Sequence, residues 1–100
     1  GVAMQVKKGS PVRSIFDGTV LYTGILDGYG NIIIIGHGEN YHSLYGYLDE
    51  IISNVGKTVR SGQIIGRSGE TGSVRGEALY FEMRYKGKPI EPTAWLSQLN

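Results

Sequence analysis

The stretch Gly76-Glu77-Ala78-Leu79-Tyr80-Phe81-Glu82-Met83-Arg84 is the part of the sequence that decides the fold. Side chains of a β-strand point alternately to its two faces. Over residues 78–85, one face therefore carries large apolar side chains and is predicted to be the core face: Leu79, Phe81, Met83 and Tyr85. The opposite face carries Ala78, Tyr80, Glu82 and Arg84. The stretch thus predicts a strand with one buried face and one more polar face.

The rest of the chain has the same β character. Its 16 glycines punctuate short runs rich in Val, Ile and Tyr, which is typical of a barrel or a sandwich. We expect strands near residues 12–16, 18–24, 31–37, 41–47, 63–67 and 78–85, with tight turns at residues 17–18, 28–31 and 85–88. Helical turns are expected at residues 48–53 and 93–96, the second with Thr93 as its N-cap. The 100 residues fit one all-β domain, residues 1–100.

Composition excludes several classes of partner. The net charge of +1 gives no bulk attraction to nucleic acid or to an anionic membrane. The longest apolar run, Ile32 to Ile35, is far shorter than the ~20 residues of a membrane span. The absence of Cys is compatible with either the cytoplasm or the cell envelope. Because the chain starts at Gly1 without a signal peptide, we expect it to be a domain excised from a longer protein.

The sequence holds few metal ligands. A catalytic zinc usually needs three protein ligands from His, Cys, Asp and Glu, plus a water. The chain has two histidines, His37 and His42, whose odd spacing puts them on opposite faces of a strand. They could converge with Glu39 only if a turn intervenes at residues 38–40. The interpretation that we favour is that His37 ends one strand and His42 begins the next.

The stretch at residues 76–82 resembles the Gly-x-His-Leu-His-Phe-Glu signature of LytM/lysostaphin-type zinc peptidases, which cut cell-wall peptides. The resemblance extends from Gly1 to about Trp95. It implies a LytM/lysostaphin-like β-sandwich or barrel-sandwich hybrid with short terminal helical turns. Other landmarks of that family stand at residues 9–12, 17–18, 28–31, 37–38, 55–56, 62–63, 65–66, 69 and 72.

The metal and catalytic positions of that family that can be read in this sequence are all replaced. Ala78 stands where the resemblance implies a catalytic His, and Tyr80 where it implies a zinc-binding His. Ala3 replaces an Asp ligand and Tyr47 replaces a second catalytic His. A phenol with a pKa near ~10 is a poor zinc ligand at neutral pH. The resemblance therefore implies a domain that has no cofactor, no metal and no peptidase activity.

The same resemblance predicts a binding groove in place of the active site. Tyr47 and the more polar face of residues 78–85 should line it, and Tyr45 should lie at its edge because it shares a face with Tyr47 in a regular strand. Ala3 should lie on the adjacent first strand. Residues 29 and 32 should lie near a turn at the groove edge, and Ile32 fits the core equally well. The predicted groove residues are Ala3, Tyr29, Ile32, Tyr45, Tyr47, Ala78, Tyr80 and Arg84. Tyr and Arg are enriched in interface hot spots. Glu82 is expected to be structural, pairing with Arg84 or another cation.

Three motifs together more specifically resemble EnvC-type activators: Leu44-Tyr45-Gly46-Tyr47, Leu79-Tyr80-Phe81-Glu82 and the closing Pro92-x-x-Trp95-Leu96. Those activators are degenerate LytM domains that switch on cell-wall amidases at the division site. The resemblance implies a bacterial periplasmic or envelope location. It also implies an N-acetylmuramoyl-L-alanine amidase, or a regulatory helix of that amidase, as the partner. Full-length activators of this kind carry a signal peptide and a coiled coil before this domain.

Three alternatives stay open. The tyrosines of the groove could stack on sugars and make the chain a direct peptidoglycan-binding module. The stretch at residues 55–66 also resembles the hammerhead motif of biotinyl and lipoyl carriers, with Lys7 or Lys8 as the modified residue, although Met-Lys-Met is absent. Residual peptidase activity is the third.

Overall fold

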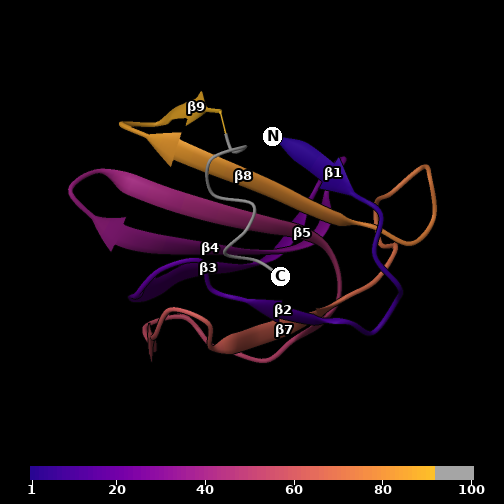
Figure 1. Cartoon of the computed structure of the whole chain (residues 1–100), viewed down its shortest axis with the longest axis horizontal. Helices are drawn as coiled ribbons and strands as arrows, with labels where there is room; N and C mark the ends of the chain where they lie inside the picture. The colour runs from indigo at the N-terminus through magenta and orange to yellow at the C-terminus, as the bar shows by residue number, and fades with distance from the viewer. Residues whose placement is uncertain (92–100) are drawn as a thin grey trace.

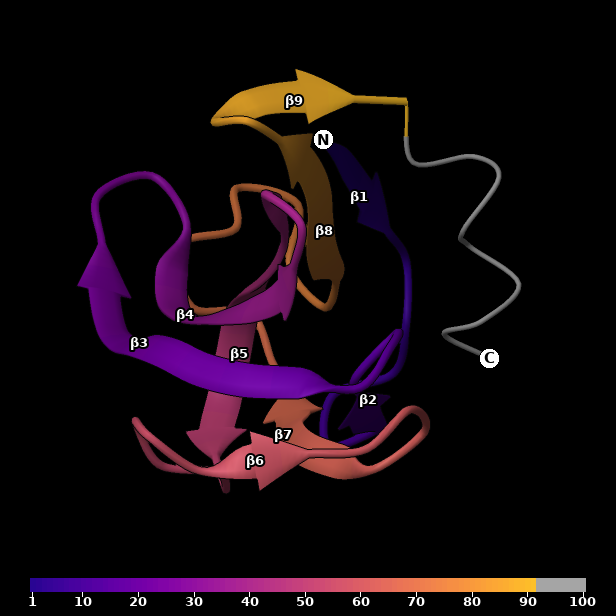
Figure 2. The same ribbon diagram turned by 90° about the vertical axis from the view of Figure 1, so that its left-hand side faces the viewer.

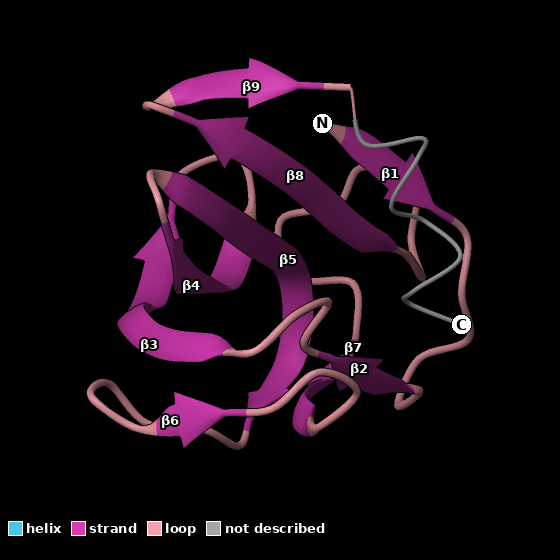
Figure 3. Cartoon of the chain, turned by 60° about the vertical axis from the view of Figure 1, so that its left-hand side comes forward, coloured by secondary structure: helices cyan, strands magenta, loops and turns pink. Residues whose placement is uncertain are grey.

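A computed structural model describes residues 1–91 of the chain, and in that part every regular element is a strand. Figures 1 and 3 show these strands arranged in a strongly curved sheet. Their bounds are β1 (Val2–Met4), β2 (Pro11–Arg13), β3 (Gly18–Leu26), β4 (Gly30–Gly38), β5 (Tyr41–Ile51), β6 (Thr58–Val59), β7 (Ile64–Ser68), β8 (Leu79–Tyr85) and β9 (Lys88–Ile90). The all-β prediction is confirmed. The expected helical turn at residues 93–96 lies outside the described residues.

One curved antiparallel sheet organises the molecule. Its order is β1-β8-β5-β4-β3-β6, and β9 pairs with β8 beyond the end of β1. β5 is long enough to pair with β4 and β8 along its first half and with β7 along its second, where β7 also carries β2. Figure 2 shows β5 running down to the β2–β7 pair. The sheet therefore folds over on itself and encloses one core.

The core is filled by apolar side chains from both parts of the sheet. Phe81 and Met83 of β8, Ile33 and Ile35 of β4, and Ile65 of β7 are almost fully buried and belong to one cluster. Leu79, Phe81 and Met83 face this core, as the alternation in β8 predicts, while Tyr85 at the strand end is partly exposed. Burial of this cluster supplies the main apolar driving force for the fold.

The expected helical turn at residues 48–53 is wrong. β5 continues through Ile51 because Leu48, Glu50 and Ile51 pair with Ser68, Arg67 and Gly66 of β7. These ladder contacts override the local preference of a short segment. The six expected ranges also leave out the short strands β6 and β9, whereas β1 is the first strand on which Ala3 was expected.

The face predicted for Tyr45 is wrong as well. Its side chain is fully buried in the core, and its hydroxyl accepts a hydrogen bond from the Ile15 N–H at 3.0 Å. Tyr45 lies opposite the core residue Phe81, whereas Gly46 lies opposite Tyr80. The alternation breaks immediately after Gly46, because Tyr47 has a left-handed φ of 62° and the β4–β5 register shifts there. Tyr45 and Tyr47 therefore do not share a face.

No helix that could cross a membrane is found among residues 1–91.

Candidate binding groove

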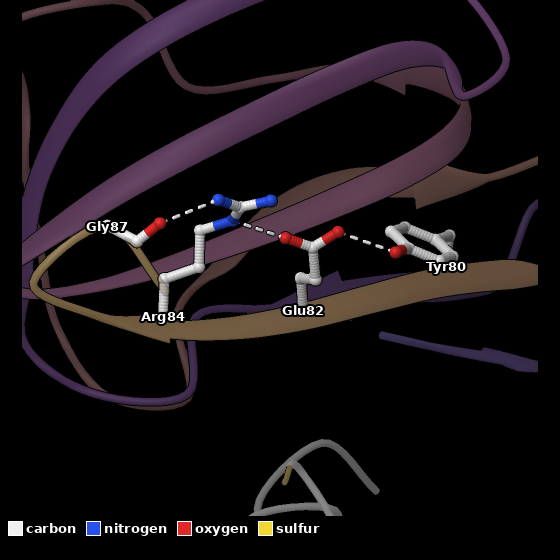
Figure 4. A network of polar contacts seen from close by, with 4 residues as sticks. All are labelled: Tyr80, Glu82, Arg84 and Gly87. Carbon is white, nitrogen blue, oxygen red and sulfur yellow. Dashed lines mark hydrogen bonds and ion pairs between the residues drawn. The ribbon is translucent and has the colours of Figure 1, made fainter. Parts of the chain in front are cut away.

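Three side chains stand in a row on the face of β8 that is turned away from the core. The Tyr80 hydroxyl donates a hydrogen bond to Glu82 Oε2 at 2.5 Å, and Arg84 Nε donates to Glu82 Oε1. Arg84 Nη1 donates to the Gly87 carbonyl oxygen at 3.0 Å. Figure 4 shows this chain of contacts along the strand. Glu82 is buried, and its pairing with Arg84 confirms the structural role expected for it.

The row fixes the protonation of its members. Burial acts to raise the pKa of the Glu82 carboxyl, but the hydrogen bonds from Tyr80 and Arg84 outweigh it, so this pKa lies below its ordinary value. Burial, followed by the hydrogen bond to Glu82, raises the pKa of the Tyr80 phenol above its ordinary value. At neutral pH the row therefore consists of a neutral phenol, a carboxylate and a guanidinium.

Two more tyrosines gather on Tyr80. The ring of Tyr29 lies 4.7 Å from the ring of Tyr80, and the ring of Tyr47 lies 5.7 Å from it, centroid to centroid. The Tyr47 N–H donates to the Tyr29 carbonyl oxygen at 2.8 Å, which ties the β5 bulge to the β3–β4 turn. Gly46 leaves room for this cluster, because a Cβ there would lie 3.3 Å from both the Tyr29 oxygen and the Tyr80 Cβ.

A hollow of about 420 Å³ opens beside the tyrosine cluster. It is lined by Gly1, Val2, Ala3, Tyr47, Ser73, Val74, Arg75, Ala78 and Tyr80. The loop between β7 and β8 forms one of its walls, with Val74 fully exposed at the tip.

The base of that loop is clamped to the sheet. Thr71 Oγ1 donates to the Leu48 carbonyl oxygen at 2.8 Å and accepts from the Asn31 N–H at 3.2 Å. A Cβ on Gly72 would lie 2.3 Å from the backbone nitrogen of Gly30, and a Cβ on Gly30 would lie 2.1 Å from the backbone carbonyl oxygen of Thr71. Both glycines also have left-handed φ angles, 75° and 66°. The two backbones approach so closely that neither position has room for a side chain.

A second hollow, of about 350 Å³, lies on the same face of the sheet beside Arg84. It is mostly apolar, and its lining residues are Leu26, Ile34, His42, Ser43, Leu44 and Arg84. His42 and Leu44 lie opposite Arg84 and Glu82 in the β5–β8 ladder, so their side chains point to the same face as the row. We refer to the two hollows and the row of polar residues between them, on β1, β8, β5 and β4, together as the groove.

The matched family model is described as Peptidase family M23, and it covers residues 1–92. The chain belongs to this family. Murein hydrolase activator EnvC of Escherichia coli K12 is 37% identical over 98% of this chain and 23% of its own length. Murein hydrolase activator NlpD of the same organism is 39% identical over 98% of this chain and 26% of its own length. The chain therefore spans about a quarter of these relatives.

The fold is also that of solved M23-like structures. A zinc-containing peptidase from Vibrio cholerae has a TM-score of 0.86 at 33% identity, over 90% of this chain and 28% of that one. The family match, the sequence identities and the fold together confirm the resemblance that the sequence suggested, to LytM-type domains and to EnvC-type activators in particular.

The M23 frame brings together most of the predicted groove residues. Ala3, Tyr47, Ala78 and Tyr80 line the first hollow, Tyr29 packs on Tyr80, and Arg84 lines the second hollow. Two predicted residues are placed elsewhere, because Tyr45 is in the core and Ile32 is 1% exposed. Neither side chain can contact a partner in this arrangement. Partner binding by the other six residues stays a prediction.

Sequence reasoning missed the apolar end of the groove. Leu26, Ile34, His42 and Leu44 line it, whereas the regular alternation that puts Tyr45 and Tyr47 on one face puts His42 and Leu44 on the other. A signal was present, because Gly46 in the interior of a strand often marks a bulge. The bulge puts Tyr47 on the same face as His42 and Leu44. The tyrosine cluster and the apolar end of the groove therefore lie on one face of the sheet.

The two histidines of this M23 domain are separated by the β4–β5 turn, where Glu39 and Asn40 have φ angles of 51° and 70°. His42 lines the groove, whereas the His37 ring lies near the core, with Nε2 2.7 Å from Ser43 Oγ. A tight turn does intervene, as the sequence suggested, but the imidazoles point to opposite faces. Among residues 1–91, no group of three His, Cys, Asp or Glu side chains is placed to hold a metal.

The residues of the groove do not fit the zinc that this fold carries in some relatives. Ala3 and Ala78, in the first hollow, have no side-chain donor atom. The Tyr80 hydroxyl keeps its proton and donates it in a hydrogen bond to Glu82, and the pKa of this phenol is raised, so Tyr80 is not a phenolate at neutral pH. Coordination by a neutral phenol alone does not make a three-ligand site.

Proposed function

We propose that this chain is a non-catalytic M23 domain that binds an N-acetylmuramoyl-L-alanine amidase through the groove and activates it. The observation that carries the proposal is the lining of the groove, which consists of stacked tyrosines and a fixed arginine, with no group of three metal ligands among residues 1–91. The names of EnvC and NlpD, as murein hydrolase activators, support an activating role rather than a hydrolytic one. The location that follows is the bacterial envelope, where murein lies.

The chemistry of the groove supports a protein segment as its ligand. Tyrosine rings offer large contact areas at low cost in side-chain entropy, and Arg84 is held by Glu82 and Gly87 before any partner arrives. Leu26, Ile34 and Leu44 add an apolar floor beside it. An amphipathic helix with apolar residues on one face and a carboxylate that meets Arg84 fits this combination.

The proposed mechanism is a shift between two amidase conformations. The groove captures a helical segment of the amidase or of its regulator and thereby frees the amidase's own zinc site. A ligand shifts such an equilibrium only by the difference in its affinity for the two states. The groove must therefore bind the segment in the open state of the amidase more tightly than in the closed state.

The test measures the release of soluble dye from dye-labelled peptidoglycan by a cognate amidase, with and without the domain. Replacing a single hot-spot residue, as in Tyr80→Ala or Arg84→Ala, is expected to weaken binding by about 2 kcal/mol, roughly thirtyfold. Arg84→Lys should also impair stimulation, because lysine cannot reproduce the guanidinium contacts. The exposed Arg60 provides a charge-matched control, so Arg60→Ala should stimulate normally.

The outcome that would reject the proposal is clear. If the Tyr80→Ala and Arg84→Ala domains fold and still stimulate the amidase fully, the groove is not the activation site. If the domain alone releases dye, and a chelator abolishes that release, the chain is a peptidase.

A second candidate is direct binding of peptidoglycan, and the stacked rings of Tyr29, Tyr80 and Tyr47 favour it. Aromatic faces of this kind can stack on sugar rings. Co-sedimentation of the domain with purified sacculi in the absence of amidase separates the two functions. Binding that is lost in Tyr80→Ala would support this second function.

A further inference from the structure

One edge of the sheet has an unpaired stretch within the described residues. β3 pairs with β4 along its length, but on its other side only its start is covered. There β6 pairs with Gly18 and Thr19, and the segment before β6 exchanges two hydrogen bonds with Val20. No described strand pairs with residues 21–26 on this side. Figure 3 shows the half of β3 that carries the arrowhead turning away from β6.

This free edge lacks two common protections against pairing. Exposed edges in monomeric proteins are commonly blocked by charged residues or proline. Residues 20–26 read Val-Leu-Tyr-Thr-Gly-Ile-Leu and contain neither. Four of their side chains are large, apolar or aromatic, and exposed, with Ile25 the most exposed at 77%: Leu21, Tyr22, Ile25 and Leu26.

The register of β3 identifies which backbone groups face outward. Val20 turns its N–H and C=O outward, since it bonds to Lys57 and Gly56. A bulge at Leu21–Tyr22 shifts the alternation by one residue. Beyond the bulge, Thr23 and Ile25 therefore turn their N–H and C=O groups away from β4, and Gly24 turns its groups toward it.

We infer that this edge pairs with the same edge of a second copy of the chain, antiparallel and about a two-fold axis at Gly24. Thr23 of each copy then exchanges hydrogen bonds with Ile25 of the other, and the two Gly24 residues face each other, each with the Tyr22 ring of its own chain lying over it. Tyr22 packs on Leu26 of the other copy. This register opposes no like charges, and the net charge of +1 per chain gives little repulsion between copies.

The pairing would join two grooves on one surface. Tyr22 and Leu26 lie opposite Ile34 and Gly30 of β4, and Ile34 and Leu26 line the groove. A two-fold axis perpendicular to the sheet keeps both groove faces on the same side. The inference does not depend on what the groove binds.

The first measurement is the weight-average mass of the chain by analytical ultracentrifugation over a wide concentration range. The mass should rise toward twice that of the monomer. Ile25→Lys should keep the chain monomeric, because it adds a charge to the edge at a side chain that is 77% exposed. Val74→Lys, at a fully exposed site on the β7–β8 loop, should still dimerise. A monomeric wild type, or an unchanged dimer in Ile25→Lys, would overturn the inference.

The second measurement tests the register, and uses the absence of cysteine from the chain. Tyr22→Cys and Leu26→Cys proteins are prepared separately, then mixed under oxidising conditions. Residues at a non-hydrogen-bonded pair are about 4.5 Å apart at Cα, within disulfide reach. The mixture should yield far more cross-linked dimer than either protein alone. Equal yields in all three samples would exclude this register.

Discussion

At the scale of the residue, Glu82 organises the groove. A buried carboxylate is stable only when its lone pairs are satisfied, and here Tyr80 and Arg84 each donate to one oxygen. The same contacts hold the two side chains that the groove would present to a partner. The preorganisation of the groove thus depends on a residue that is itself buried.

We predict that Glu82→Gln destabilises the domain by about 1–3 kcal/mol, because the glutamine amide turns an N–H₂ group toward one of the two donors. The folded pKa of Glu82 is lowered, so its contribution is present above the ordinary carboxyl pKa and is lost as pH falls through the folded value. Urea unfolding at neutral and acid pH measures both effects.

Glu50→Gln is the control variant. It removes an exposed carboxylate 3.8 Å from Arg67 and should lower the free energy of unfolding by under about 1 kcal/mol. Equal losses in the two variants would contradict the prediction.

At the scale of the element, the bulge in β5 decides which tyrosine belongs to the groove. Residues that precede it alternate regularly, so Tyr45 goes to the core. Tyr47 takes a left-handed φ of 62° and reaches Tyr80 from the other side. For a residue with a Cβ, this conformation costs on the order of 1 kcal/mol, which the surrounding contacts must offset.

This backbone strain predicts an inversion of the usual order of two substitutions. In a regular strand, a protein with glycine at a given position is less stable than the same protein with alanine there. At position 47 the order should be reversed, with the Tyr47→Gly protein more stable than the Tyr47→Ala protein by about 1 kcal/mol. Denaturant midpoints of the two variants measure the difference. Thr19, exposed in β3 and without a positive φ, serves as the control site, where Ala should exceed Gly. The usual order at position 47 would show that the left-handed conformation is not held.

The same contrast explains how much could be predicted from the sequence. The faces of β8 followed from alternation alone, because β8 pairs in regular register with β5. The faces of β5 did not, since one extra residue in a strand reverses every side chain after it. Nor could local patterns give the strand at residues 48–51, which depends on pairing with β7. Six of the eight predicted groove residues could be identified from the sequence. The apolar end of the groove at Leu26 and Ile34 could not, because it depends on the curvature of the sheet.

At the scale of the whole molecule, a chain of polar contacts that is exposed at Asp17 and buried at Ser43 and Tyr45 ties the β2–β3 turn to β5. His37 Nδ1 lies 2.8 Å from the Asp17 carbonyl oxygen, which can only accept, so Nδ1 carries the hydrogen. Nε2 of the neutral ring then accepts from Ser43 Oγ, which also lies 2.8 Å from the Tyr45 hydroxyl. Burial lowers the pKa of His37 below its ordinary value.

A pH dependence of folding follows. Because the folded pKa of His37 is below the unfolded value near 6.5, the unfolded chain binds more protons in the window between them. The free energy of unfolding should therefore fall as pH drops below about 6.5. In His37→Gln this slope should vanish above the range where carboxylates titrate, although the variant is less stable throughout. Unfolding curves between pH 8 and pH 5 give both slopes, and an unchanged slope in His37→Gln would assign the effect elsewhere.

The contact between Gly30 and Gly72 has a consequence for association rates. A wall that must first become ordered slows capture and adds an entropic cost to it. Here the loop that borders the first hollow is anchored at Thr71 and by two backbones in direct contact, so its base is set when the domain folds. Only the tip around Val74 is left to adapt. A partner should therefore associate in a single fast phase, without a slow step of loop rearrangement.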